Sequence, residues 1–176
     1  EAIRGSEHRE AFNLANPILA TTPQELVAAH RDRPTILHFA GHGDDRSLSF
    51  LLDQGALVSQ TPVMREQLAT ILGNFPKRVR LCVFNTCDSA SIAKYLVEAH
   101  VVDAAMGWPA KLDDAAAITF SQAFYGRIGD GLTLSQSNAL AAQSCGSEEC
   151  PELYTDGSVD PNMFTFVERS KNEYRS

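Results

Sequence analysis

Two short apolar runs, each followed by a reactive side chain, most strongly limit what this chain can fold into. Residues 35–40 and 79–85 have the length and the nearly continuous apolar character that are typical of buried parallel strands. A histidine between two glycines follows the first run, at 41–43, and Cys87 follows the second run. Carboxyl ends of neighbouring parallel strands meet at one edge of a sheet, and ligands bind there in open α/β folds. The sequence therefore predicts that His42 and Cys87 lie at one edge.

Helical segments separate these runs, which favours an α/β domain with a mostly parallel sheet and helices on both faces. The length of 176 residues is typical of one domain, so we expect 1–176 to form a single domain or a large processed fragment of one. Helices are predicted at 22–30, 61–72, 89–98, 114–125 and 133–143, with a short helix within 1–12. Strands are predicted within 12–20, at 35–40, 79–85 and 101–106, in a hairpin at 48–52 and 56–58, and at 163–167 after a loop at 144–162.

The charge of the chain argues against two classes of partner. The net charge is −7, so the domain lacks the basic surface of a nucleic-acid binder and is repelled by anionic membranes. No apolar run has the roughly 18 residues that a membrane span needs. Four cysteines are too few for a disulfide framework at this length. We therefore expect a soluble cytoplasmic protein with reduced thiols and with neither nucleic-acid nor membrane partners.

The histidine and the cysteine are suited to nucleophilic catalysis. An imidazole can take the proton of a thiol, and the thiolate can then attack a carbonyl carbon. The oxyanion that forms needs donors aimed at it, and the backbone N–H groups of Gly43 and Cys87 are the candidates. The sequence thus offers His42 as general base and Cys87 as nucleophile. The alternatives are a solvent-facing turn histidine and a small buried core cysteine.

Four ordered blocks of sequence carry a family resemblance. They are the runs at 36–43 and 83–89, a third block formed by 105–108 with 113–125 and Gly131, and a short run at 8–12. In their order along the chain, these blocks resemble CHAT domains, the bacterial relatives of caspases and separase, of the type found in multi-domain conflict proteins. The resemblance covers about residues 7–142.

The resemblance implies a caspase-like three-layer sandwich and endopeptidase activity on protein substrates. It implies neither a metal nor a cofactor in the chemistry. It also implies activation by a partner or a fused sensor domain, in bacterial antiviral defence or cell suicide. A docking or assembly module without catalysis is the alternative, and it predicts that thiol-reactive peptide probes leave Cys87 unlabelled.

One strand of the family pattern is absent from the sequence. CHAT domains open with an apolar strand that lies in the middle of the sheet, and this chain starts after it. A gap in a buried parallel sheet would leave backbone N–H and C=O groups unpaired, which is costly. We therefore expect a separate or cleaved companion segment to supply the strand, or the chain to be a processed product.

Five further residues are candidates for substrate binding, each with a structural alternative. Asn85 can line the pocket or make a hydrogen bond at a strand end, and Trp108 can be a pocket wall or a packed aromatic. Asp113 and Asp114 can form an acidic wall of the substrate pocket or cap a helix. Asp44 can also belong to such a wall, or it can lie in a solvated loop. Acidic groups at the pocket favour a basic residue before the scissile bond.

Two other types of site find little support. Cys145 and Cys150 form a single pair, whereas a structural zinc site needs four ligands. A nucleotide-binding flavodoxin-like domain would need a glycine-rich phosphate loop after a strand, and none occurs.

Overall fold

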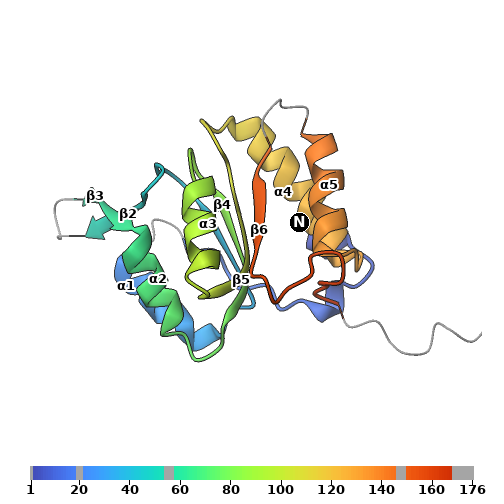
Figure 1. Cartoon of the computed structure of the whole chain (residues 1–176), viewed down its shortest axis with the longest axis horizontal. Coiled ribbons are helices and arrows are strands. Elements are labelled where there is room, and N and C mark those ends of the chain that lie inside the picture. The colour runs from blue at the N-terminus through green and yellow to red at the C-terminus, as the bar shows by residue number, and fades with distance from the viewer. Residues whose placement is uncertain (1, 19–21, 54–57, 146–149, 168–176) are drawn as a thin grey trace, which may run out of the picture. The chain divides into compact units, whose positions relative to one another are not determined.

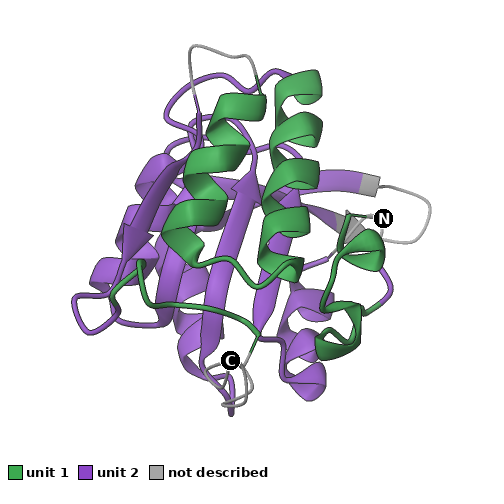
Figure 2. Ribbon diagram, turned by 90° about the vertical axis from the view of Figure 1, so that its right-hand side faces the viewer, with its two compact units in different colours: residues 1–15, 114–147, 160–176 green, residues 16–113, 148–159 purple. Residues whose placement is uncertain are grey.

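The chain consists of two compact units. The computed structural model describes residues 2–18, 22–53, 58–145 and 150–167. One unit comprises residues 16–113 and 148–159, and the other comprises 1–15, 114–147 and 160–176 (Figure 2). We call them the sheet unit and the helical unit and describe each by itself. The predicted single domain stays a prediction.

The sheet unit contains a four-stranded sheet in the order β1-β4-β5-β6 (Figure 1). Three parallel neighbours form its body, namely β1 (Ile36–Ala40), β4 (Val79–Asn85) and β5 (Val102–Gly107). The fourth strand, β6 (Glu152–Thr155), pairs antiparallel with β5. The predicted strands at 35–40, 79–85 and 101–106 are therefore confirmed, and the fold is mixed α/β with a mostly parallel sheet.

Helices cover the sheet face that carries Cys82 and Phe84. The helices of this unit are α1 (Pro23–Ala28), α2 (Arg65–Gly73) and α3 (Ala90–Glu98). Leu68 and Leu72 of α2 share one apolar cluster with those two strand residues. The cluster also includes Ile92, Ala93, Leu96 and Val97 of α3, and Leu26 of α1 packs against it. The helices thus form a packed layer on this face of the sheet.

A hairpin follows β1, as predicted. Its second strand was predicted at 56–58, of which residues 56–57 lie outside the described residues, and the observed strand extends further, to residue 64. It consists of β2 (Ser47–Asp53) and β3 (Val58–Met64), which pair antiparallel. The helix predicted from residue 61 begins only at Arg65, so that prediction was wrong at its start. Pro62 explains the difference, because a proline pushes the preceding residue into extended backbone and is tolerated in a two-stranded ribbon.

The ends of the chain differ most from the predictions. The described part of the predicted strand at 12–20, residues 12–18, forms no strand, and residues 19–21 lie outside the described residues. Residues 163–167 form no strand either, and the last strand is β6, inside the predicted loop at 144–162. The predicted strand at 163–167 was therefore wrong, and the predicted loop at 144–162 was wrong in that it contains the strand β6.

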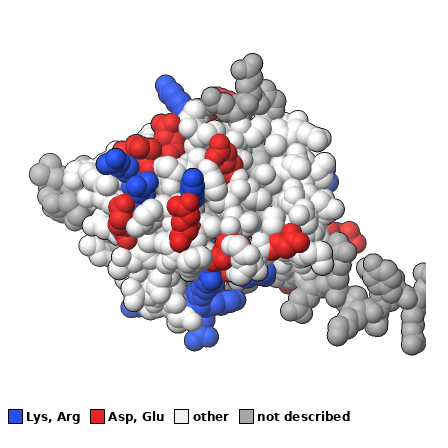
Figure 3. All heavy atoms as spheres, in the orientation of Figure 1, with Lys and Arg blue, Asp and Glu red and all other residues white. Residues whose placement is uncertain are grey.

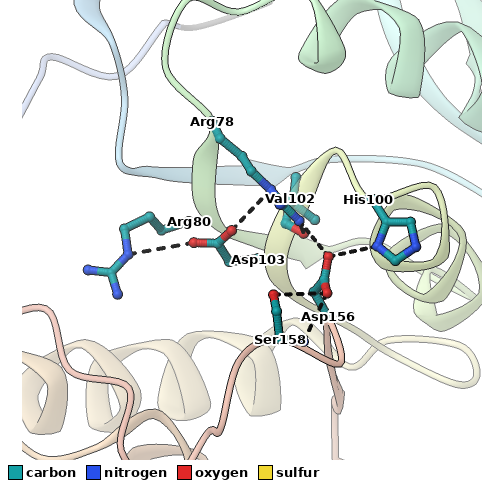
Figure 4. A network of polar contacts seen from close by, with 7 residues as sticks. All are labelled: Arg78, Arg80, His100, Val102, Asp103, Asp156 and Ser158. Atoms are coloured by element: carbon teal, nitrogen blue, oxygen red, sulfur yellow. Dashed lines mark hydrogen bonds and ion pairs between the residues drawn. The ribbon is translucent and has the colours of Figure 1, made fainter.

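An ionic network fastens the segment after β6 to the amino ends of β4 and β5 (Figure 4). Asp156 accepts hydrogen bonds from Arg78 Nη2 at 2.7 Å and forms a 2.8 Å contact with His100 Nδ1. Arg78 also pairs with Asp103 at 3.0 Å. The hydrogen bond with His100, followed by that from Arg78, holds the pKa of Asp156 well below its usual range. Asp156 is therefore ionised and anchors β6. The network lies at the end of the sheet opposite to the strand ends that His42 and Cys87 follow.

Two helices form most of the helical unit. They are α4 (Asp114–Gly129) and α5 (Leu134–Ser144), preceded in the chain by the 3₁₀ turns η1 (Ile3–Gly5) and η2 (Arg9–Ala11). Phe120 and Phe124 of α4 are fully buried and stack with centroids 5.6 Å apart. Thr133 caps α5 by accepting from the Gln136 N–H.

The predictions about nucleic-acid and membrane partners concern the charges on the surface and the lengths of the helices. On the described face in Figure 3, acidic and basic side chains both occur, and no continuous basic surface crosses it. Among the described residues, no helix has the length and apolarity that a membrane crossing requires.

Candidate functional site

The carboxyl ends of β1 and β4 lie next to each other. Ala40 pairs with Asn85 in parallel register, and the Gly41 N–H donates to the Asn85 carbonyl at 3.3 Å. His42 and Cys87 each follow a paired position by two residues in adjacent strands. The structure thus brings the two segments to the same edge of the sheet.

A tight hairpin fixes the backbone on both sides of His42. The Ser49 N–H donates to the His42 carbonyl at 2.9 Å, and the Asp44 N–H donates to the Ser47 carbonyl at 3.0 Å. Between these two bonds, Gly43 faces Leu48 as a non-hydrogen-bonded pair. At such a position the N–H points away from the partner strand, so the ladder does not use the Gly43 N–H. The His42 side chain is exposed.

The carboxylate of Asp44 closes this hairpin. It accepts hydrogen bonds from the Arg46 N–H at 2.9 Å, the Ser47 N–H at 2.7 Å and the Ser47 hydroxyl at 3.1 Å. The Arg46 N–H is the main reason that the pKa of Asp44 is lowered. The Asp44 carboxylate is therefore engaged with its own turn, while the side chain as a whole is exposed.

A second contact joins the hairpin that carries His42 to α3, the helix that follows Cys87. The Ser91 hydroxyl, in the first turn of α3, donates to the Asp45 carbonyl. The hairpin that carries His42 and the helix that follows Cys87 are thus joined directly.

Buried polar groups hold the turn that carries Cys87. Thr86 and Ser89 on either side are fully buried, whereas Cys87 is half-buried. The Ser89 hydroxyl donates to the Thr86 carbonyl at 2.8 Å and accepts from the Trp108 N–H at 3.1 Å. Asp88 has a φ of +53°, a left-handed conformation that Asp tolerates better than most residues. After this turn the chain leaves the direction of the strand, so Cys87 is half-buried while most residues of β4 are buried.

The two cysteines of this strand region lie in different environments. Cys82 is 1% exposed, and burial raises the pKa of its thiol to about 12. A buried neutral thiol is inert, so Cys82 is a core residue. Cys87 lies beyond the strand end, with its sulfur 3.4 Å from the Leu112 backbone nitrogen.

Asn85 and Trp108 contact each other. Trp108 is 2% exposed, and its Nε1 donates to Asn85 Oδ1 at 3.2 Å. The indole therefore orients the half-buried amide of Asn85 from inside the protein. The structure brings these two candidates together, with the ring of Trp108 packed in the core.

The remaining acidic candidates are the two residues at which the chain passes from one unit to the other. Asp113 is exposed and ends the segment after β5, in the sheet unit. Asp114 is exposed and is the first residue of α4, where a carboxylate interacts favourably with the helix dipole.

Sequence reasoning missed the residues that support the site. Ser89 stands at the N-cap of α3, where serine is common, but its hydroxyl donates to the Thr86 carbonyl and does not cap the helix. The Ser91 hydroxyl donates to the Asp45 carbonyl, a contact for which the sequence gives no signal. The contact of Leu112 comes from its backbone, which no sequence pattern indicates.

Comparisons with known proteins agree with the resemblance found in the sequence. No family model matches the chain. The chain is similar to the Roc-COR-CHAT protease of Runella zeae. The two are 30% identical over 147 residues, which is 84% of this chain but 15% of the relative. This similarity supports a relationship to CHAT domains. Because the chain spans so small a share of the relative, the activity of the relative's whole protein is not carried over.

Proposed function

We propose that this chain is a caspase-like cysteine endopeptidase domain that cleaves proteins through Cys87 and His42. The observation that carries the proposal is the parallel pairing of Ala40 with Asn85, which puts both segments at one sheet edge. The similarity to a protein named as a CHAT protease supports it. The finer fold assignment, a three-layer caspase-like sandwich, belongs to the same proposal.

In the proposed mechanism His42 takes the proton of the Cys87 thiol. The thiolate attacks the carbonyl carbon of the scissile peptide bond and forms a tetrahedral intermediate. The protonated imidazole then gives its proton to the leaving amine, and the acyl group stays on the sulfur as a thioester. A water molecule, deprotonated by His42, attacks the thioester and releases the second product and the thiol.

The oxyanion of each tetrahedral intermediate needs nearby donors. We assign this role to the backbone N–H groups of Gly43 and Cys87. The hairpin geometry supports the first assignment, because its ladder does not use the Gly43 N–H. Both donors belong to turns with fixed backbones, so they require no reorganisation during the reaction.

Asn85 and Asp113 are the proposed contacts for the substrate residue before the scissile bond. Trp108 orients the Asn85 amide, and the exposed carboxylate of Asp113 favours a basic substrate residue. Cleavage profiles on a peptide library, for the wild type and for Asp113→Ala, test this preference. A loss of preference for Arg and Lys in the variant is expected, and an unchanged profile contradicts the assignment.

The biological setting is also a proposal. We propose a cytoplasmic enzyme that a partner or sensor domain activates in bacterial antiviral defence or cell suicide. Within the described sheet β1 pairs with β4 alone, which is compatible with a companion segment that adds the family's opening strand beside β1.

A labelling experiment tests the proposed dyad. A peptidyl acyloxymethyl ketone with arginine next to the warhead should label the wild type at Cys87, as read by peptide mass spectrometry. Cys87→Ala and His42→Ala should both lose labelling while their circular dichroism spectra stay native. Cys145→Ala is the matched control, because Cys145 is also half-buried and forms no disulfide with any described cysteine. Undiminished labelling of Cys87→Ala, or of His42→Ala, contradicts the proposal.

A further inference from the structure

A short backbone segment runs alongside the Cys87 turn. The Asp88 N–H donates to the Ala110 carbonyl at 3.0 Å, and the Leu112 N–H donates to Cys87 Sγ at 3.4 Å. The two hydrogen bonds run in opposite directions between the segment and the turn, as in a strand pair, with the Cys87 sulfur as acceptor in place of a backbone carbonyl oxygen. The segment that follows β5 therefore reaches the sulfur itself and not only the backbone beside it.

The segment is firmly held at its start. Trp108 is buried, its N–H donates to the Ser89 hydroxyl, and its carbonyl accepts from the Ala90 N–H at 2.9 Å. The same residue is bonded to Asn85 through its indole. The start of the segment is thus bonded to residues on both sides of the Cys87 turn, and the bond between the Ala110 carbonyl and the Asp88 N–H holds its middle.

A backbone N–H next to a sulfur discriminates between its two protonation states. A neutral thiol is a weak acceptor, whereas a thiolate is a charged one, and hydrogen bonds to charged acceptors are roughly twice as strong as neutral ones. A donor fixed before ionisation therefore favours the thiolate. The thiolate is the form that acts as nucleophile.

We propose that Leu112 is a positioning residue whose backbone N–H stabilises the thiolate of Cys87. The inference rests on the proposed function in that it assigns a reactive role to Cys87. It makes the reactivity of the nucleophile depend on the conformation of residues 109–112. A movement of this segment would weaken the nucleophile without touching His42.

Other titratable and charged groups belong to the elements around Cys87. They are His42, Asp44 and Asp45 in the hairpin, Asp88 in the Cys87 turn, Lys111 in the segment and Asp113 directly after it. A test must leave all of them in place, so the variant has to remove only the Leu112 N–H.

Leu112→Pro removes this N–H, and Leu112→Ala is the matched variant that keeps it. The rate of Cys87 alkylation by iodoacetamide is measured by mass spectrometry from neutral to alkaline pH. In Leu112→Pro the rate at neutral pH, relative to the alkaline plateau of the same protein, should fall about 10-fold, as for a lost hydrogen bond to a charged group. Leu112→Ala should retain the wild-type profile. An unchanged profile in folded Leu112→Pro overturns the inference.

Nuclear magnetic resonance of the unmodified chain provides a test that needs no proline. The Leu112 amide proton should shift with pH in step with the alkylation profile of Cys87, and this shift should vanish in Cys87→Ala. A Leu112 amide that ignores the ionisation of Cys87 overturns the inference. Neither measurement depends on peptide cleavage, so failure here is distinct from failure of the proposed dyad, which the labelling of Cys87→Ala and His42→Ala decides.

Discussion

Replacement of Gly43 by alanine should disturb the hairpin that carries His42. A Cβ at this position would lie 2.8 Å from the Ser47 carbonyl oxygen and 3.0 Å from Thr86 Oγ1. Real Cβ contacts essentially never fall under 3.0 Å, so one of these neighbours has to move. The closest atom belongs to the backbone of the same hairpin, and the hydroxyl is fully buried. The Ser47 carbonyl cannot move without altering the hairpin.

The expected magnitude follows from this overlap. Inserting a methyl group into a well-packed site costs about 1–3 kcal/mol of unfolding free energy. Gly43 does not have a positive φ, so the cost is steric and not conformational. Because relief of the clash displaces the His42 backbone and the Gly43 N–H, probe labelling of Cys87 should slow about 10- to 100-fold.

Gly41→Ala is the matched control on the other side of His42. Its Cβ would meet nothing closer than the Phe39 ring at 3.4 Å, which is an ordinary contact. We expect a change in unfolding free energy within about 0.5 kcal/mol. Urea unfolding and probe-labelling rates, measured on both variants, give the comparison. Equal stability and equal labelling in Gly43→Ala and Gly41→Ala would refute the steric argument.

Three further substitutions test other parts of the structure. Ser89→Ala removes the buried hydroxyl that joins the Thr86 carbonyl to the Trp108 N–H, and urea unfolding should show a loss of about 1–3 kcal/mol; an unchanged midpoint contradicts this. Asp156 has a lowered pKa, so its stabilisation is present above an unfolded pKa of about 3.9 and is lost as pH falls below that value. The difference in melting temperature between the wild type and Asp156→Asn should therefore narrow from pH 5 to pH 2, and a pH-independent difference speaks against the network. Thr22→Ala removes the cap of α1 and should cost about 0.5–2 kcal/mol, which thermal unfolding measures; no loss would mean that the cap contributes nothing.

The elements that the sequence predicted well are those with strong local signals. The apolar runs of β1 and β4 have no competing interpretation as long helices, and Thr22 marks a helix start by capping. The strands β1 and β4 bring the segments of His42 and Cys87 to the same end of the sheet, so that placement could be predicted from local patterns alone.

The wrong predictions arose where local propensity and tertiary contacts disagree. Residues 163–167 are rich in strand-forming side chains, but the Phe164 N–H bonds to the Asp160 carbonyl, and the Phe164 carbonyl accepts from Leu134. Phe164 and Phe166 pack edge to face in place of pairing as a strand. The four-residue strand β6 is held partly from outside, through Asp156 just after its end, and such support is invisible in a local pattern.

Of the proposed site, the sequence indicates only the side chains. Cysteine and histidine have characteristic chemistry, so their places after strand ends carry information about a proposed nucleophile and base. The Leu112 N–H and the Gly43 N–H are backbone groups that every non-proline residue has, and only the fold decides where they point. Ser89 is intermediate, because its hydroxyl is visible in the sequence while its backbone partners are not.

The left-handed backbone at Asp88 explains why the Cys87 turn needs so much support. For a non-glycine residue this conformation costs roughly 1–2 kcal/mol, and it persists only where its surroundings impose it. The Ala110 carbonyl satisfies the Asp88 N–H on one side, and the buried Ser89 hydroxyl binds the turn on the other. A relaxed turn would lose both contacts and would move the sulfur away from the Leu112 N–H. The same hydrogen bonds that stabilise the strained turn therefore also fix the position from which Cys87 would attack.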